Sequence, residues 1–133
     1  MHKIFRDERL LTELDFKRLN NLHDGQLPSE LVDTLDALDL VSSREIPPDF
    51  VTMYSQVIVE DLGSKKRQKL TLCYPVDAEP QRGFISVLSP VGASLLGQRV
   101  GAIARWQTPN GEVCAAEIAA LLFQPEASGD YTT

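Results

Sequence analysis

In the first third of the chain, apolar residues recur every three or four positions, which is the spacing of an amphipathic helix. One such stripe predicts a helix over residues 13–22 and consists of Phe16, Leu19 and Leu22. A second stripe predicts a helix from residue 28 to residue 41 and consists of Leu31, Leu35, Leu38 and Val41. The two stripes can pack on each other, so we expect a short antiparallel helical hairpin of the coiled-coil type over residues 1–46.

The residues around these stripes carry signals that begin and end helices. Thr12 and Asp15 have the arrangement of a capping box, in which a hydroxyl precedes the helix and a carboxylate three residues later reaches back. The Asp-Gly step at residues 24 and 25 ends the first helix, and Pro28 is tolerated in the first turn of the second. Consecutive prolines at 47 and 48 oppose helical geometry. We therefore place a domain boundary between residues 46 and 47.

From residue 51 onward the apolar period changes to two, which is typical of strands with one buried face. The Asn110-Gly111 step between strand-like runs at 102–107 and 113–123 predicts a β-hairpin. Ser89 and Pro90 predict a short helix that ends at Gly97. The alternating residues are Val57, Val59, Leu70, Leu72, Tyr74, Ile85 and Val87.

The order of these elements predicts an α+β fold. Residues 47–133 should form an antiparallel sheet with one helix packed on a face. We expect residues 124–133 to be an irregular tail.

Charge and cysteine usage narrow the classes of partner and compartment. The formal net charge of −6 disfavours non-specific attraction to nucleic acids, so we expect a basic protein partner and contact with DNA or RNA only through that protein. Charged residues interrupt the N-terminal stretch, so we expect no membrane span and a cytoplasmic protein. Cys73 and Cys114 lie in apolar runs outside any CxxC motif, and we expect free, buried thiols.

Several stretches resemble a known family. Residues 83–97 read GFISVLSPVGASLLG, and residues 106–112 read WQTPNGE; both resemble the C-terminal domain of the GreA/GreB transcription factors. Residues 48–55 read PDFVTMYS, and residues 123–131 read FQPEASGDY; these resemble the Rnk branch of that family, named as regulators of nucleoside diphosphate kinase. The resemblance implies an FKBP-like C-terminal domain that docks on the rim of the RNA polymerase secondary channel, with an N-terminal coiled coil pointing into the channel.

The same resemblance implies which residues dock. The candidate docking residues lie in the predicted helix at 89–97 and are Ser89, Pro90, Val91, Leu95 and Leu96. An alternative is that Ser89 only caps this helix and Pro90 only starts it. Leu95 and Leu96 can belong to the core or to the docking surface, and we expect Trp106 to be buried beside the β-hairpin.

The candidate residues at the tip of the helical hairpin are His23, Asp24 and Glu30. The resemblance implies that, in the cleavage factors, acidic residues at the tip of a longer coiled coil help to hold a second catalytic magnesium in the polymerase. Here the turn holds one acid, Asp24, and Glu30 already belongs to the next helix. We therefore expect no catalysis, no metal site and no cofactor.

The sequence leaves several functions open. The first is a monomeric regulator that binds the polymerase and competes with Gre-type factors. The second is a cleavage factor in which Asp24 and Glu30 donate to a metal held by the polymerase. The third is an effector of nucleoside diphosphate kinase, which we expect to act indirectly, because neither a GxGxxG nor a P-loop pattern is present.

Two charged surfaces are open to two interpretations each. The acids Glu30, Asp33, Asp36 and Asp39 recur every three residues and form either a solvated helix face or a contact for basic channel walls. The cations Lys65, Lys66, Arg67 and Lys69 form either a solvated turn or a contact for an acidic partner.

Overall fold

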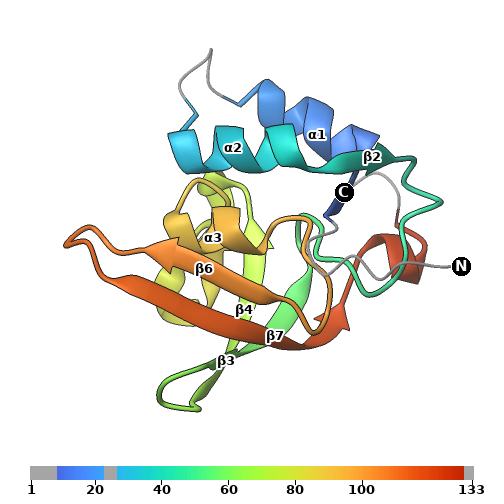
Figure 1. Cartoon of the computed structure of the whole chain (residues 1–133). Helices are drawn as coiled ribbons and strands as arrows, with labels where there is room; N and C mark the ends of the chain where they lie inside the picture. The colour runs from blue at the N-terminus through green and yellow to red at the C-terminus, as the bar shows by residue number, and fades with distance from the viewer. Residues whose placement is uncertain (1–8, 23–26, 131–133) are drawn as a thin grey trace, which may run out of the picture.

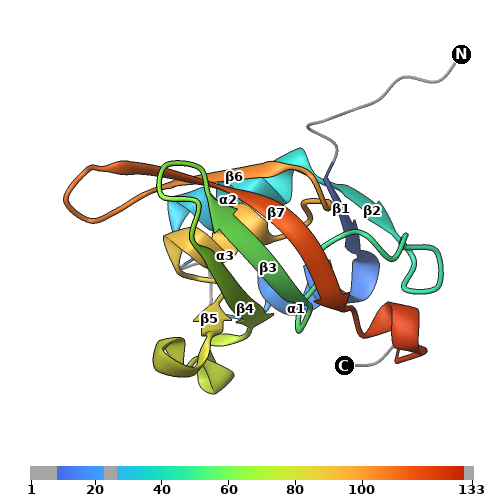
Figure 2. The same ribbon diagram turned by 90° about the horizontal axis from the view of Figure 1, so that it is seen from below.

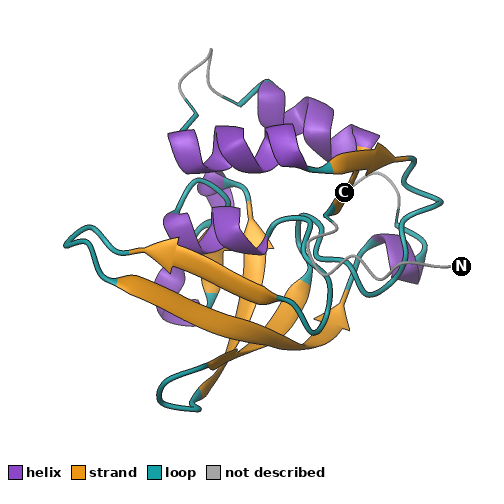
Figure 3. Cartoon of the chain, in the orientation of Figure 1, coloured by secondary structure: helices purple, strands orange, loops and turns teal. Residues whose placement is uncertain are grey.

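The computed structural model describes residues 9–22 and 27–130. It is an α+β structure with a five-stranded sheet and three α-helices, and Figures 1 and 2 show the helices on the same side of that sheet. The strand order is β5-β4-β3-β7-β6, and the strands are β3 (Gln56–Asp61), β4 (Arg67–Cys73), β5 (Phe84–Ser86), β6 (Ile103–Gln107) and β7 (Val113–Phe123). Helix α3 (Pro90–Leu95) lies between the sheet and the N-terminal helices (Figure 3).

The N-terminal helices begin near where the periodicity predicts. Helix α1 spans Glu13–Asn20 and helix α2 spans Ser29–Ala37. The prediction of helix up to residue 41 is wrong, because Asp39–Val41 form strand β2, which pairs in parallel with β1 (Leu10–Thr12). The Asp39 N–H donates to the Arg9 carbonyl at 2.9 Å, so a backbone partner distant in sequence replaces the last turn of the helix.

Half of the predicted capping box is confirmed. The Thr12 hydroxyl accepts a hydrogen bond from the Asp15 N–H at 3.1 Å, as an N-cap should. The Asp15 carboxylate does not complete the box, because its Oδ2 accepts from the Met53 N–H at 3.2 Å, on the far side of the predicted domain boundary.

Helix α2 packs mainly on α3, where we expected it to pack on the first helix. One contact is polar: the Thr34 hydroxyl lies 3.3 Å from the Ala93 carbonyl, to which it donates. The apolar stripe of α2 is buried as predicted, but it joins one core that also holds residues of the sheet. The segments before and after residue 46 therefore share a single hydrophobic core, in which the fully buried members include Leu11, Leu19, Leu31, Val57, Leu72, Leu96 and Ile118.

The C-terminal strands follow the predicted alternation, and the predicted β-hairpin is confirmed as the antiparallel pair β6 and β7. The prediction of an antiparallel sheet is wrong at one edge, because β5 runs parallel to β4. Two short 3₁₀ turns, η1 (Pro75–Asp77) and η2 (Pro80–Arg82), carry the chain back before β5 starts, and this connection sets its direction.

The last described residues are fastened to the body, so the prediction of an irregular tail is wrong for 124–128. Gln124 is buried and its Nε2 donates to the Pro47 and Phe50 carbonyls at 2.9 and 2.8 Å. A further 3₁₀ turn, η3 (Glu126–Ser128), follows. Cys73 and Cys114 are free thiols; Cys73 is buried and Cys114 half-buried.

Candidate docking site

The start of α3 presents the first candidate docking residues at the surface. Ser89 is the N-cap: its backbone is extended, its Oγ accepts from the Gly92 N–H at 3.1 Å, and its hydroxyl donates to the Ser86 carbonyl at 2.7 Å. Pro90 occupies the first turn, where its missing N–H leaves no bond unmade. Ser89, Pro90 and Val91 are half-buried, so the capping role is confirmed and an exposed edge remains for contact.

The structure removes Leu95 and Leu96 from the docking surface. Their side chains are 1% and 0% exposed and belong to the hydrophobic core. A partner could reach them only after the core had opened, which would expose two of its largest buried side chains. Their role is to anchor α3.

Gly92 sets how closely α3 approaches the sheet. A Cβ atom built on it would lie 2.0 Å from the Ser86 carbonyl oxygen and 2.9 Å from the Val87 Cα. Both are backbone atoms and have little freedom to move. The helix therefore rests directly on the end of β5, and the glycine inside the SPVGA stretch was the sequence signal for this contact.

The other end of α3 is held by the N-terminal segment. The Arg9 guanidinium donates to the Ala93, Ser94 and Leu96 carbonyls at 3.0–3.2 Å, which are acceptors left open where the helix ends. Burial lowers the pKa of Arg9, yet arginine stays charged in proteins. Sequence reasoning missed Arg9 because its partners lie more than 80 residues away.

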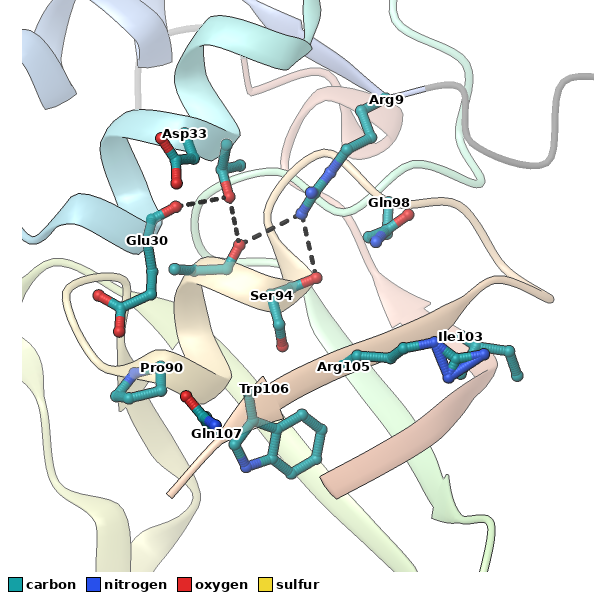
Figure 4. A pocket seen from close by; sticks show the side chains of 12 residues that line it. Arg9, Glu30, Asp33, Pro90, Ser94, Gln98, Ile103, Arg105, Trp106 and Gln107 are labelled. Atoms are coloured by element: carbon teal, nitrogen blue, oxygen red, sulfur yellow. Dashed lines mark hydrogen bonds between the residues drawn. The ribbon is translucent and has the colours of Figure 1, made fainter. Parts of the chain in front are cut away.

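A groove of about 300 Å³ lies beside the exposed start of α3 (Figure 4). It runs between α2, α3 and β6, and its walls carry both acidic and basic side chains. The residues that line it are Arg9, Glu30, Asp33, Thr34, Pro90, Ala93, Ser94, Gln98, Ile103, Arg105, Trp106 and Gln107.

Four residues named from the sequence line this groove: Glu30, Asp33, Pro90 and Trp106. Glu30, expected at the hairpin tip, is exposed on α2 and lines the groove together with Pro90. Trp106 is half-buried: it packs against the core and also lines the groove, so the expected burial is confirmed only in part. Within the described part of the chain, the Glu30 carboxylate has no hydrogen-bond or ion-pair partner.

The other candidate tip residues, His23 and Asp24, lie outside the described residues. Over residues 9–22 and 27–130, no group of three or more His, Cys, Asp or Glu side chains is placed to hold a metal ion. In the same ranges, no helix is both long and apolar enough to cross a membrane. The basic run at 65–69 is exposed, and Arg67 pairs there with Glu60 at 2.9 Å.

A match to a family model defines the class of this protein. Residues 46–122 match the family model described as transcription elongation factor, GreA/GreB, C-term. The chain therefore belongs to the GreA/GreB family of transcription factors.

Individual relatives narrow the comparison. The chain is 37% identical to the regulator of nucleoside diphosphate kinase of Escherichia coli (strain K12), over 92% of this chain and 94% of that protein. It is 32% identical to the transcription elongation factor GreA of Chloroherpeton thalassium, over 62% of this chain and 52% of that factor. Among solved structures it is similar to the prokaryotic transcription elongation factor GreA/GreB from Nitrosomonas europaea, with a TM-score of 0.71 and 34% identity over 87% of this chain and 98% of that one. The Escherichia coli relative is named as a regulator and not as an enzyme.

Proposed function

We propose that this chain is a monomeric, cytoplasmic regulator that binds RNA polymerase at the rim of the secondary channel and has no catalytic activity of its own. Its family and the names of its relatives support a role in transcription. The observation that carries the docking assignment is the half-exposed helix start at Ser89, Pro90 and Val91, fixed at one end by Gly92 and at the other by Arg9. A rigid, partly apolar edge suits recognition because little ordering is required on binding.

In this proposal the N-terminal helices widen the docking face. Helix α2 packs on α3, and its Glu30 lines the groove together with Pro90. A partner that covers Pro90 would therefore also meet Glu30 and Asp33, to which basic side chains are complementary. We propose that the protein acts by occupying the rim, in competition with Gre-type factors. We also propose that the C-terminal domain is FKBP-like and that the N-terminal helices form a coiled-coil-like hairpin.

The alternative of a cleavage factor finds less support. It requires Glu30 and Asp24 together at a tip that reaches the polymerase metal. Glu30 instead lies against the body beside Pro90, and α2 rises only about 14 Å at roughly 1.5 Å per residue. We expect no shortening of the transcript when the protein is added to backtracked polymerase complexes. Shortening that is lost in Asp24→Asn would favour the cleavage factor.

An effect on nucleoside diphosphate kinase, suggested by the name of the Escherichia coli relative, is proposed to be indirect. It would follow from altered transcription. Direct binding of the purified kinase to this chain would contradict that part of the proposal.

The docking assignment can be tested with a matched pair of variants. Pro90→Glu replaces the apolar ring that a partner would cover with a longer, hydrated carboxylate that must lose its water on docking, while glutamate remains acceptable in the first turn of a helix. Pro80→Glu makes the same change in the first turn of η2, at an exposed position outside the docking site. We expect Pro90→Glu to weaken capture of core RNA polymerase by at least about tenfold, roughly 1.4 kcal/mol, and Pro80→Glu to bind like the parent.

Urea unfolding of both variants shows whether the fold is kept. Equal capture of the polymerase by a folded Pro90→Glu and by Pro80→Glu would contradict docking at this edge.

A further inference from the structure

Two carboxyl groups from opposite ends of the chain are buried in one polar cluster. Asp15, in the first turn of α1, is 1% exposed, and Glu126, in η3, is 8% exposed. Both are tied to the turn at residues 52–55: Asp15 Oδ2 accepts from the Met53 N–H at 3.2 Å, and Glu126 Oε1 accepts from the Thr52 hydroxyl at 2.7 Å. The turn thus receives one carboxyl from each terminal segment.

The cluster is short of partners for two negative charges. Asp15 Oδ1 is buried and, within the described part of the chain, has no hydrogen-bond partner. Across the turn, the Thr52 hydroxyl lies 3.0 Å from the Ser55 hydroxyl. A buried, ionised carboxylate normally accepts several hydrogen bonds or pairs with a cation. The arrangement therefore suits one neutral carboxyl better than two ionised ones.

Among the described residues, three charged or titratable groups face Asp15 from different parts of the chain. Glu126 in η3 repels its charge, Arg18 on α1 attracts it, and Tyr74 lies beside both Asp15 and Arg18. Burial is the main cause that raises the pKa of Asp15 to about 7, Glu126 adds to it, and the Met53 N–H and Arg18 act in the opposite direction.

Glu126 is affected in the same direction. Burial raises its pKa first, and Asp130 adds repulsion, whereas the hydrogen bond from Thr52 opposes the rise. Both acids of the cluster are thus harder to ionise in the folded chain.

We propose that Asp15 and Glu126 form a proton-controlled latch, which fastens α1 and η3 to the turn at residues 52–55 while at least one of the two carboxyls carries a proton. When both are ionised, Asp15 holds a buried charge whose Oδ1 has no hydrogen-bond donor within the described part of the chain, and a second negative charge lies nearby. Local opening of α1 lets water reach that charge, so deprotonation favours the open form.

The latch differs from the docking site in place and in test. It lies at the start of α1 and involves neither Pro90 nor the groove, so the inference stands independently of the proposed function. Opening would nevertheless affect the N-terminal unit as a whole, because α1 leads into α2, and α2 packs on α3.

The experiment uses the isolated chain and nuclear magnetic resonance between pH 5 and 9. We expect the side-chain carboxyl carbon of Asp15 to titrate with a midpoint near 7, as its raised pKa requires. We also expect hydrogen-exchange protection of α1 amides, corrected for the intrinsic rate, to fall by about tenfold for each pH unit from pH 5 up to that midpoint and to level off above it. Amides of the β3–β7 ladder should keep their protection.

Matched variants separate a latch from a general loss of stability. Asp15→Asn removes the titrating group and should make α1 protection independent of pH, whereas Glu13→Gln makes a like change in the same turn at an exposed position and should behave like the parent. If Asp15→Asn does not fold, Glu126→Gln provides the second test, because removing the repelling charge should lower the Asp15 midpoint. A midpoint of Asp15 below pH 5, or α1 protection that follows the sheet amides at every pH, would overturn the proposal.

Discussion

The substitution Gly92→Ala tests the close approach of α3 to the sheet. The added Cβ would lie 2.0 Å from the Ser86 carbonyl oxygen and 2.8 Å from its carbonyl carbon, distances far inside van der Waals contact. In an exposed helix, the same change would stabilise by about 1 kcal/mol, because alanine loses less backbone entropy than glycine. Overpacking against atoms that cannot move costs about 1–3 kcal/mol and sometimes more. With backbone on both sides, we expect the clash to win by about 2 kcal/mol or more.

The assay is urea unfolding followed by far-ultraviolet circular dichroism, with Gly63→Ala as the control. A Cβ at Gly63 would meet only the Asp61 Oδ2 atom, at 3.3 Å, a side-chain contact that a shift of a few tenths of an ångström relieves. We expect Gly63→Ala to change the free energy of unfolding by less than about 0.5 kcal/mol. If Gly92→Ala were as stable as Gly63→Ala, α3 would not rest on β5 as described, and the reasoning about the docking edge would fail with it.

Three further perturbations follow from single contacts. Arg9→Ala removes the guanidinium that donates to the Ala93, Ser94 and Leu96 carbonyls, of which, within the described part of the chain, only Ala93 keeps a second donor, the Thr34 hydroxyl. It should lower the free energy of unfolding by about 1.5–3 kcal/mol in urea titrations, whereas Lys17→Ala on the exposed side of α1 should have little effect. Gln124→Ala removes both hydrogen bonds to the loop at residues 47–50 and should destabilise by about 2 kcal/mol; an unchanged urea midpoint would contradict the fastening of the C-terminal segment. The pKa of Asp15 rises from 3.8 to about 7 on folding, so its contribution to stability is complete below pH 3.8 and is lost as the pH rises through 7. The loss is at most about 4 kcal/mol. A parent chain that becomes more stable from pH 5 to pH 8 would refute this sign.

Local patterns predicted the elements with long, regular signals. The alternation after residue 51 and the Asn110-Gly111 step placed β3, β4 and the β6–β7 pair, because two-residue periodicity and turn chemistry act between neighbours. Ser89 and Pro90 likewise placed the start of α3. The stripe of α2 was predicted as buried, but its partner was not, since one apolar stripe packs equally well on different helices.

The errors lie where contacts distant in sequence decide. β1 and β2 have three residues each, too few to show a periodicity. They form because they pair with each other, although both helices lie between them in the sequence. β5 is equally short, so its direction depended on the two 3₁₀ turns before it. Leu95 and Leu96, named as docking candidates, stayed open between core and surface, because a helix of six residues makes fewer than two turns and cannot separate an inner from an outer face.

The same limit applies to the site. A glycine inside a short helix was a local sign of the close contact at Gly92. No local pattern connects Arg9 with the end of α3, or Asp15 with Glu126. Such side chains become recognisable only when the fold brings their partners to them. The polymerase-docking assignment itself came from a resemblance and was narrowed by burial to Ser89, Pro90 and Val91.

The most direct test of the proposed function is equilibrium binding of the labelled chain to core RNA polymerase, followed by competition with an unlabelled GreA-type factor at moderate salt. Moderate salt suppresses weak charge attraction between exposed groups. We expect one chain bound per polymerase and complete displacement by the competitor. Absence of binding at micromolar polymerase, or binding that the GreA-type factor does not displace, would contradict docking at the secondary-channel rim.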